Sequence, residues 1–127
     1  MNDEQYLSHC RELLSGFARG MLTRTEHLSA EDSLRQLAEA FGELADSGAD
    51  LYGEGATLTS RLFTTYPDFA PTYPRELLWF LGGECLHFMP DEEIELFQQL
   101  EEQRIAAAAL GETLDLREAR AKLLKLQ

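Results

Sequence analysis

The sequence predicts an all-α protein, and three observations support this prediction. Apolar residues recur three or four positions apart along most of the 127-residue chain, which is the period of an amphipathic helix. No stretch alternates apolar and polar residues over the length of a strand. An apolar fraction of 44% at this length is enough for one core. We therefore expect one helical domain over 1–127, an antiparallel bundle of five to six helices around a central apolar helix at about 74–88.

Two helices are predicted in the first third of the chain. Residues 3–22 carry an apolar stripe from Tyr6 to Met21, with charged residues on the opposite side. A second helix is expected over 30–46, because Ser29 is a good N-cap residue and a narrow stripe of leucine and phenylalanine follows it.

Glycine and proline interrupt the middle of the chain. Gly53 and Gly55 weaken a helix at their positions, so the third helix is expected over about 56–65. Three prolines lie within 67–74, and the residue before a proline is disfavoured in helical geometry. Residues 66–73 are therefore predicted to form a loop. Its aromatic side chains must either cover the core or be available to a partner.

The segment 74–88 is the most apolar part of the chain. Pro74 suits the first turn of a helix, and apolar side chains cover nearly all faces of the helix that follows. A helix that is apolar all round is buried among its neighbours or between subunits. Gly82 and Gly83 weaken this helix, and we expect the close approach of a neighbouring helix there as compensation.

Two further helices are expected in the last third of the chain. Pro90 opens a helix over about 90–110, with acidic residues in its first turn, where they favour the positive end of the helix dipole. Gly111 ends it. The segment 114–127 is predicted to form a basic C-terminal helix, since it carries four basic residues against two acidic ones. Such a helix is suited to docking on the acidic body of the chain or of a second copy.

The charge balance excludes several classes of function. The chain has 11 basic and 23 acidic residues and a net charge of −12 at pH 7. Nucleic-acid binding requires clustered lysine and arginine, and anionic membranes attract basic surfaces. We therefore expect neither a nucleic acid nor a membrane as a partner. The charge favours a protein partner that is basic or that presents an apolar helix.

The cysteines and the apolar stretches bear on the cellular compartment. Cys10 and Cys85 lie far apart and imply no disulfide framework. The first ten residues are acidic and lack the apolar region of a signal peptide. The longest apolar stretch, 77–89, is shorter than a membrane span. We expect a cytoplasmic protein.

One short motif suggests a metal site. Glu84 and His87 form a Glu-x-x-His pair, which places both side chains on one helix face and occurs twice in di-iron helical bundles. His9 and Glu12 have the same spacing in reverse order. The alternative interpretation of the chain is therefore a metal-binding helical protein that uses these four residues. A single motif match has a high false-positive rate, so the favoured explanation is that Glu84 and His87 pair with each other or with a basic group on an exposed strip.

Catalytic motifs are missing from the sequence. It contains no G-x-S-x-G, no P-loop and no G-x-G-x-x-G. Both cysteines fall on apolar stripes, where thiols are usually buried and inert. We therefore favour a non-enzymatic role and predict no cofactor.

An interaction surface is the stronger prediction. Aromatic side chains beside acidic ones are typical of recognition patches. The candidate residues are Tyr66, Phe69, Tyr73, Trp79, Asp91, Glu92 and Glu95. We interpret the protein as a non-enzymatic protein–protein interaction module, such as a small acidic adaptor, chaperone or inhibitor. A homodimer through the 74–88 helix or the alanine-rich residues 106–109 is a further expectation.

Overall fold

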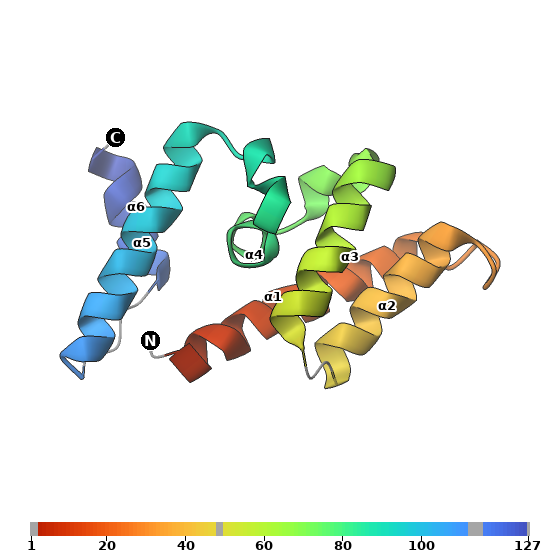
Figure 1. Ribbon diagram of the computed structural model, residues 1–127, viewed down its shortest axis with the longest axis horizontal. Coiled ribbons are helices and arrows are strands. Elements are labelled where there is room, and N and C mark those ends of the chain that lie inside the picture. The colour runs from red at the N-terminus through yellow and green to blue at the C-terminus, as the bar shows by residue number, and fades with distance from the viewer. Residues whose placement is uncertain (1–2, 48–49, 112–115, 127) are drawn as a thin grey trace. The chain divides into compact units, whose positions relative to one another are not determined.

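The computed structural model describes residues 3–47, 50–111 and 116–126 (Figure 1). Every regular element in these ranges is helical, which confirms the all-α prediction. The elements in chain order are α1 (Asp3–Arg24), α2 (Ser33–Ser47), α3 (Leu51–Thr65), the 3₁₀ helix η1 (Pro67–Thr72), α4 (Arg75–Leu81), the 3₁₀ helix η2 (Gly83–Phe88), α5 (Asp91–Ala109) and α6 (Leu116–Leu126).

The chain forms two compact units. The 10–86 unit is Cys10–Leu86, and it contains most of α1 together with α2, α3, η1 and α4. The 87–127 unit is His87–Gln127 together with Met1–His9, and it contains α5, α6 and the start of α1. A single domain over the whole chain stays a prediction.

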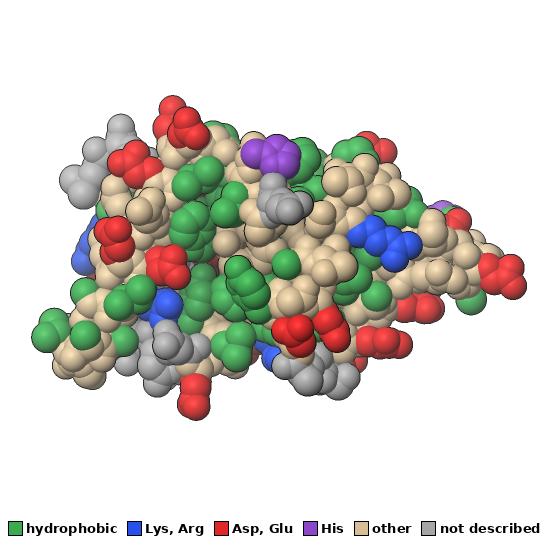
Figure 2. All heavy atoms as spheres, viewed as in Figure 1, with side chains coloured by type: hydrophobic (Ala, Val, Ile, Leu, Met, Phe, Trp, Pro, Cys, Tyr) green, Lys and Arg blue, Asp and Glu red, His purple; other side chains and the backbone are tan. Residues whose placement is uncertain are grey.

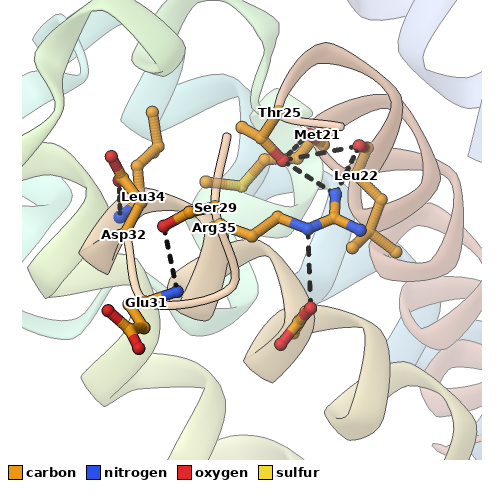
Figure 3. Close-up of polar contacts among 9 residues, drawn as sticks. Met21, Leu22, Thr25, Ser29, Glu31, Asp32, Leu34 and Arg35 are labelled. Atoms are coloured by element: carbon orange, nitrogen blue, oxygen red, sulfur yellow. Dashed lines mark hydrogen bonds and ion pairs between the residues drawn. The ribbon is translucent and has the colours of Figure 1, made fainter. Parts of the chain in front are cut away.

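The start of α2 differs from the predicted one, and the reason is a change of cap. The sequence placed the N-cap at Ser29, whereas α2 begins at Ser33. The Asp32 carboxylate accepts a hydrogen bond from the Leu34 amide at 2.9 Å (Figure 3), so Asp32 is the cap. Ser29 instead accepts from the Glu31 amide in the preceding turn, at 3.3 Å. A charged cap stabilises the positive end of a helix more than a hydroxyl does.

An arginine from α2 stabilises the C-terminal end of α1. Arg35 Nη1 donates to the Leu22 carbonyl at 2.7 Å and to Thr25 Oγ1 at 3.2 Å (Figure 3). The last carbonyls of a helix have no partner within that helix and carry its negative partial charge. Glu39 lies one turn further along α2 and holds Arg35 in place through an ion pair at 3.5 Å.

An arginine from α1 does the same for the C-terminal end of α2. Arg11 Nη1 donates to the carbonyls of Leu44 and Ala45, at 3.2 and 3.4 Å. Each helix of the α1–α2 pair thus caps the other with a guanidinium. Such a reciprocal arrangement fixes the two helices in one register.

Four aromatic rings fill the core of the 10–86 unit. Tyr73 is 2% exposed and makes edge-to-face contacts with Phe17 and Phe63, at centroid distances of 4.9 and 5.5 Å. Phe41 contacts Phe17 in the same way at 5.4 Å. The Tyr73 hydroxyl shares a hydrogen bond of 2.6 Å with Thr59 Oγ1, which satisfies both buried groups. Burial raises the pKa of Tyr73, because the phenolate would be desolvated there.

The third helix starts earlier than predicted. Asp50 caps it by accepting from the Gly53 amide at 3.0 Å, so α3 tolerates both glycines in its first turns. A Cβ at Gly55 would lie 2.8 Å from Leu81 Cδ1, so glycine permits the close packing of α4 on α3. The expected loop at 66–73 is largely the 3₁₀ helix η1, with Pro67 in its first turn.

The helix predicted over 74–88 is divided in two. The break lies at Gly82 and Gly83, where Gly83 takes φ +50° and so leaves α-helical geometry. A Cβ at Gly82 would lie 2.2 Å from the Leu78 carbonyl oxygen, which excludes any larger residue in this backbone. Leu77, Leu78 and Leu81 are buried as expected, so the apolar character of the segment is confirmed and its continuity is wrong.

The 87–127 unit is built on α5 and α6. Its buried apolar side chains are Met89, Leu96, Phe97, Leu100, Ala119 and Leu123. Two arginine side chains lie against aromatic rings in this core: Arg104 over Tyr6 at 4.4 Å and Arg120 over Phe97 at 5.3 Å. Gly111 takes φ +73° just after α5, which agrees with the predicted helix end.

Candidate interaction surface

The aromatic candidates serve the 10–86 unit itself. Tyr73 is inside the core, so its ring is not available to a partner in this structure. The Tyr66 hydroxyl forms a hydrogen bond with Ser33 Oγ. The ring of Phe69 is partly covered by the Arg24 guanidinium, 4.3 Å from its centroid, and Trp79 is half-buried. Tyr73 therefore has the covering role that the sequence left open, whereas Tyr66, Phe69 and Trp79 are only half-buried and their part in binding stays a prediction.

The acidic candidates are exposed. Asp91, Glu92 and Glu95 lie in the first turns of α5, in the 87–127 unit, whereas the four aromatic candidates belong to the 10–86 unit. Asp91 and Glu95 are one helical turn apart and therefore share a face of α5. Glu102 is exposed two turns further along the same face.

The same face of α5 becomes apolar towards its C-terminal end. Ile105 is 55% exposed and Leu110, directly after the helix, is 75% exposed. Ala106 and Ala109 are exposed between them. Figure 2 shows acidic side chains over the first part of α5 and hydrophobic ones over its C-terminal end. We define the outward face of α5 by its exposed residues, which are Asp91, Glu95, Glu102, Ile105, Ala106, Ala109 and Leu110.

The sequence pattern placed Ile105 on the inner side of this helix. The structure places Arg104 there instead, 6% exposed, because Phe97, Leu100 and Arg104 follow the three- and four-residue steps of the buried stripe. The guanidinium of Arg104 lies over the Tyr6 ring, which provides a favourable contact for the buried charge. The sequence signal for the exposure of Ile105 is its neighbour Arg104, a charged residue at a position that continues the inner stripe.

The metal candidates are partly outside the described side chains. Nothing is described of the Glu84 side chain. His87 is exposed with its ring 4.3 Å from that of Phe88, His9 is half-buried 6.4 Å from the Tyr6 ring, and Glu12 is exposed. Within the described side chains, no three from His, Cys, Asp and Glu come together as metal ligands do. Metal binding that includes Glu84 stays a prediction.

Two other expectations concern the cysteines and the membrane. Cys10 and Cys85 are both buried thiols, as their positions on apolar stripes predicted. None of the helices in the described ranges combines the length and apolarity needed to cross a bilayer.

Comparison with known proteins adds one finding. No curated protein and no solved structure matches this chain. The family model described as PA2817-like matches residues 3–127, which is nearly the whole sequence. The chain therefore belongs to the PA2817-like family.

Proposed function

We propose that this protein is a non-enzymatic, cytoplasmic interaction module that binds a basic amphipathic segment of another protein along the outward face of α5. The observation that carries the proposal is the chemistry of that face, where exposed acidic residues are followed by exposed Ile105 and Leu110. Large apolar side chains of this exposure are more typical of binding surfaces than of free helix faces when they occur together.

Charge selects the partner. Asp91, Glu95 and Glu102 present one sign of charge over about three turns of α5. A net charge of −12 on the whole chain strengthens the attraction of a basic partner over a longer range. Ile105 and Leu110 require apolar side chains at one end of that partner. An amphipathic helix with lysine or arginine at one end and leucine or phenylalanine at the other satisfies both requirements.

A fluorescence anisotropy titration tests this proposal. The probes are a labelled amphipathic helical peptide of lysine and leucine, and the same peptide with glutamate in place of each lysine. We expect the lysine peptide to bind and the glutamate peptide not to bind. Ile105→Asn with Leu110→Asn should weaken binding by about tenfold, since loss of an apolar anchor costs more than 1 kcal/mol.

Two matched controls separate this site from general attraction to an acidic protein. Tyr52→Asn removes an exposed apolar side chain of the other unit and should leave the affinity unchanged. Glu95→Gln with Glu102→Gln should weaken binding more than Glu26→Gln with Glu31→Gln, which makes the same change of net charge in the 10–86 unit. The proposal would be contradicted if Tyr52→Asn weakened binding as much as the Ile105 and Leu110 double variant, or if the two glutamine double variants weakened it equally.

A second copy of the chain is the alternative partner, and sedimentation equilibrium distinguishes it from a basic segment. If the wild-type protein is a dimer that Ile105→Asn with Leu110→Asn converts to a monomer, the partner on this face is a second copy and not a basic segment. A monomer that binds the lysine peptide supports the function proposed above.

A further inference from the structure

An open groove lies in the 10–86 unit, and none of its lining residues belongs to the outward face of α5. It has a volume of about 590 Å³, within the range of small-ligand sites. One wall is a face of α3 that carries Thr57, Ser60, Arg61 and Thr64. The other wall is the backbone of Gly82 and Gly83. Both walls belong to the same compact unit.

Gly83 leaves the backbone uncovered beside this groove. It turns the chain at φ +50°, and a Cβ at this position would meet no atom within 4 Å. Any side chain at Gly83 would therefore extend into open space beside the groove. Because position 83 is glycine, a ligand can approach the backbone on one side and the α3 side chains on the other.

Arg61 is the cationic group of the groove. Its side chain is exposed, and among the described residues no carboxylate pairs with it. Other arginines of this chain have structural contacts: Arg11 and Arg35 cap helices, and Arg24, Arg104 and Arg120 lie over aromatic rings. In a chain with 23 acidic residues, a guanidinium left without such a contact is available to an external anion.

The hydroxyls of the groove define the rest of the ligand. Thr57 Oγ1 donates to the Gly53 carbonyl at 3.2 Å, and Thr64 Oγ1 donates to the Ser60 carbonyl at 2.8 Å. Since each hydroxyl has one proton, both oxygens are left to act as acceptors. A ligand must therefore bring hydrogen-bond donors next to its anionic group. The backbone amides beside the terminal carboxylate of a peptide are such donors.

We propose that this groove binds the C-terminal end of a peptide chain. The terminal carboxylate would accept both hydrogen bonds of the Arg61 fork, and backbone amides next to it would donate to the oxygens of Thr57 and Thr64. Gly83, which has no side chain, leaves room for the peptide backbone. This site is independent of the function proposed for α5, because it uses other residues of another unit.

The test is an NMR titration of the ¹⁵N-labelled full chain with N-acetyl-alanyl-alanine and with its C-terminal amide. We expect saturable shifts of the amide signals of Thr57, Ser60, Arg61, Thr64 and Gly83 with the acid and none with the amide. Arg61→Ala should weaken binding about tenfold or more, since a charge-assisted hydrogen bond is lost. Arg19→Ala, which removes another exposed arginine of the same unit, should leave binding unchanged.

A second pair of variants tests the acceptor role. Thr57→Val keeps the shape of the side chain, removes the oxygen and should weaken binding several-fold. Thr23→Val makes the same change at an exposed threonine that also donates to a backbone carbonyl, and it should have no effect. Equal binding of acid and amide, binding unchanged in Arg61→Ala, or no saturable shift at millimolar peptide would overturn the proposal. Inorganic phosphate that binds through Arg61 where the dipeptide does not would also overturn it.

Discussion

The two units of this protein treat their large apolar side chains differently. In the 10–86 unit the large rings are buried or covered, and Tyr52 is its one strongly exposed large apolar residue among those described. In the 87–127 unit Leu7, Phe88, Ile105 and Leu110 are all exposed. The first unit therefore satisfies its own apolar groups, whereas the second leaves several to solvent or to a partner. The element proposed for binding is therefore the one with exposed apolar surface, and not the one richest in aromatic residues.

The arginines of the two units also differ, although Arg24 of the 10–86 unit lies over the Phe69 ring as well. In the 10–86 unit Arg11 and Arg35 hydrogen-bond to backbone carbonyls at helix ends, where direction and distance are both restrictive. In the 87–127 unit Arg104 and Arg120 lie over ring faces, a contact that tolerates more variation in geometry. The first arrangement fixes one helix pair, and the second fills a core that is poor in large side chains.

The largest expected effect is the loss of a core ring from the 10–86 unit. Phe41 is fully buried against Phe17, and Phe41→Ala should lower the free energy of unfolding by about 3–5 kcal/mol through lost burial and a cavity. Urea denaturation measures this value. Leu110→Ala is the matched change in the other unit and should stay within about 0.5 kcal/mol of wild type, because this side chain is 75% exposed. Similar losses in both variants would remove the contrast between the units.

The next effect concerns the reciprocal arginine caps. Arg35→Met keeps the length of the side chain but leaves the Leu22 carbonyl and Thr25 without this donor. We expect a loss of about 1–2 kcal/mol, typical of a charge-assisted hydrogen bond at a helix end. Arg19→Met changes an exposed arginine on α1 and serves as the control. A thermal melt that does not separate the two variants would show that the cap contributes little.

The hydrogen bond between Tyr73 and Thr59 predicts a smaller effect with its own pH dependence. Tyr73→Phe leaves the Thr59 hydroxyl buried without this partner, and we expect a loss of about 1 kcal/mol at neutral pH. Thr59→Val in the same background should restore part of it, because the unpaired hydroxyl is then removed.

At alkaline pH the contribution of Tyr73 to the free energy of unfolding changes sign and becomes unfavourable to the fold. Burial raises the pKa of Tyr73 in the folded chain above the ordinary value of 10.0. Above that pH the unfolded chain loses the phenolic proton while the folded chain keeps it, so stability falls as the pH rises. The fall contributed by this one group is limited to about 1.4 kcal/mol per pH unit. Tyr73→Phe should lack this contribution, and parallel pH profiles of unfolding for the two proteins would contradict it.

Local sequence patterns predicted the helices well and the details of the site less well. Local patterns placed a helix at each of the six α-helical segments described, through a periodic apolar stripe in most of them and through continuous apolar composition at 74–88. The boundaries moved where a carboxylate caps the helix, at Asp32 and Asp50. The break at Gly83 and the burial of Tyr73 depend on backbone conformation and on tertiary contacts with Thr59 and Phe63, which no local pattern contains.

The exposed end of α5 could have been anticipated only by giving up a simple rule. An apolar residue near a helical stripe is usually counted with it, so Ile105 was expected on the inner side of α5. Arg104 lies there instead, with its guanidinium over the ring of Tyr6, about a hundred positions away in sequence. Periodicity describes positions within one helix, so it does not predict an aromatic ring that a distant segment contributes. The exposed apolar end of the surface proposed for binding was therefore not predicted from the sequence.

The smallest expected change in stability belongs to the surface proposed for binding. Ile105→Asn with Leu110→Asn should shift the free energy of unfolding by only about 0.5 kcal/mol, because both side chains already contact water and isoleucine and asparagine have similar helix propensities. The same variant should be retained less on a hydrophobic-interaction column, whereas Tyr52→Asn should lower retention less. A large destabilisation would mean that these residues support the fold. Unchanged retention would mean that the apolar surface is covered in solution, and the contrast between the units would then describe a single chain in isolation and not the protein in its working state.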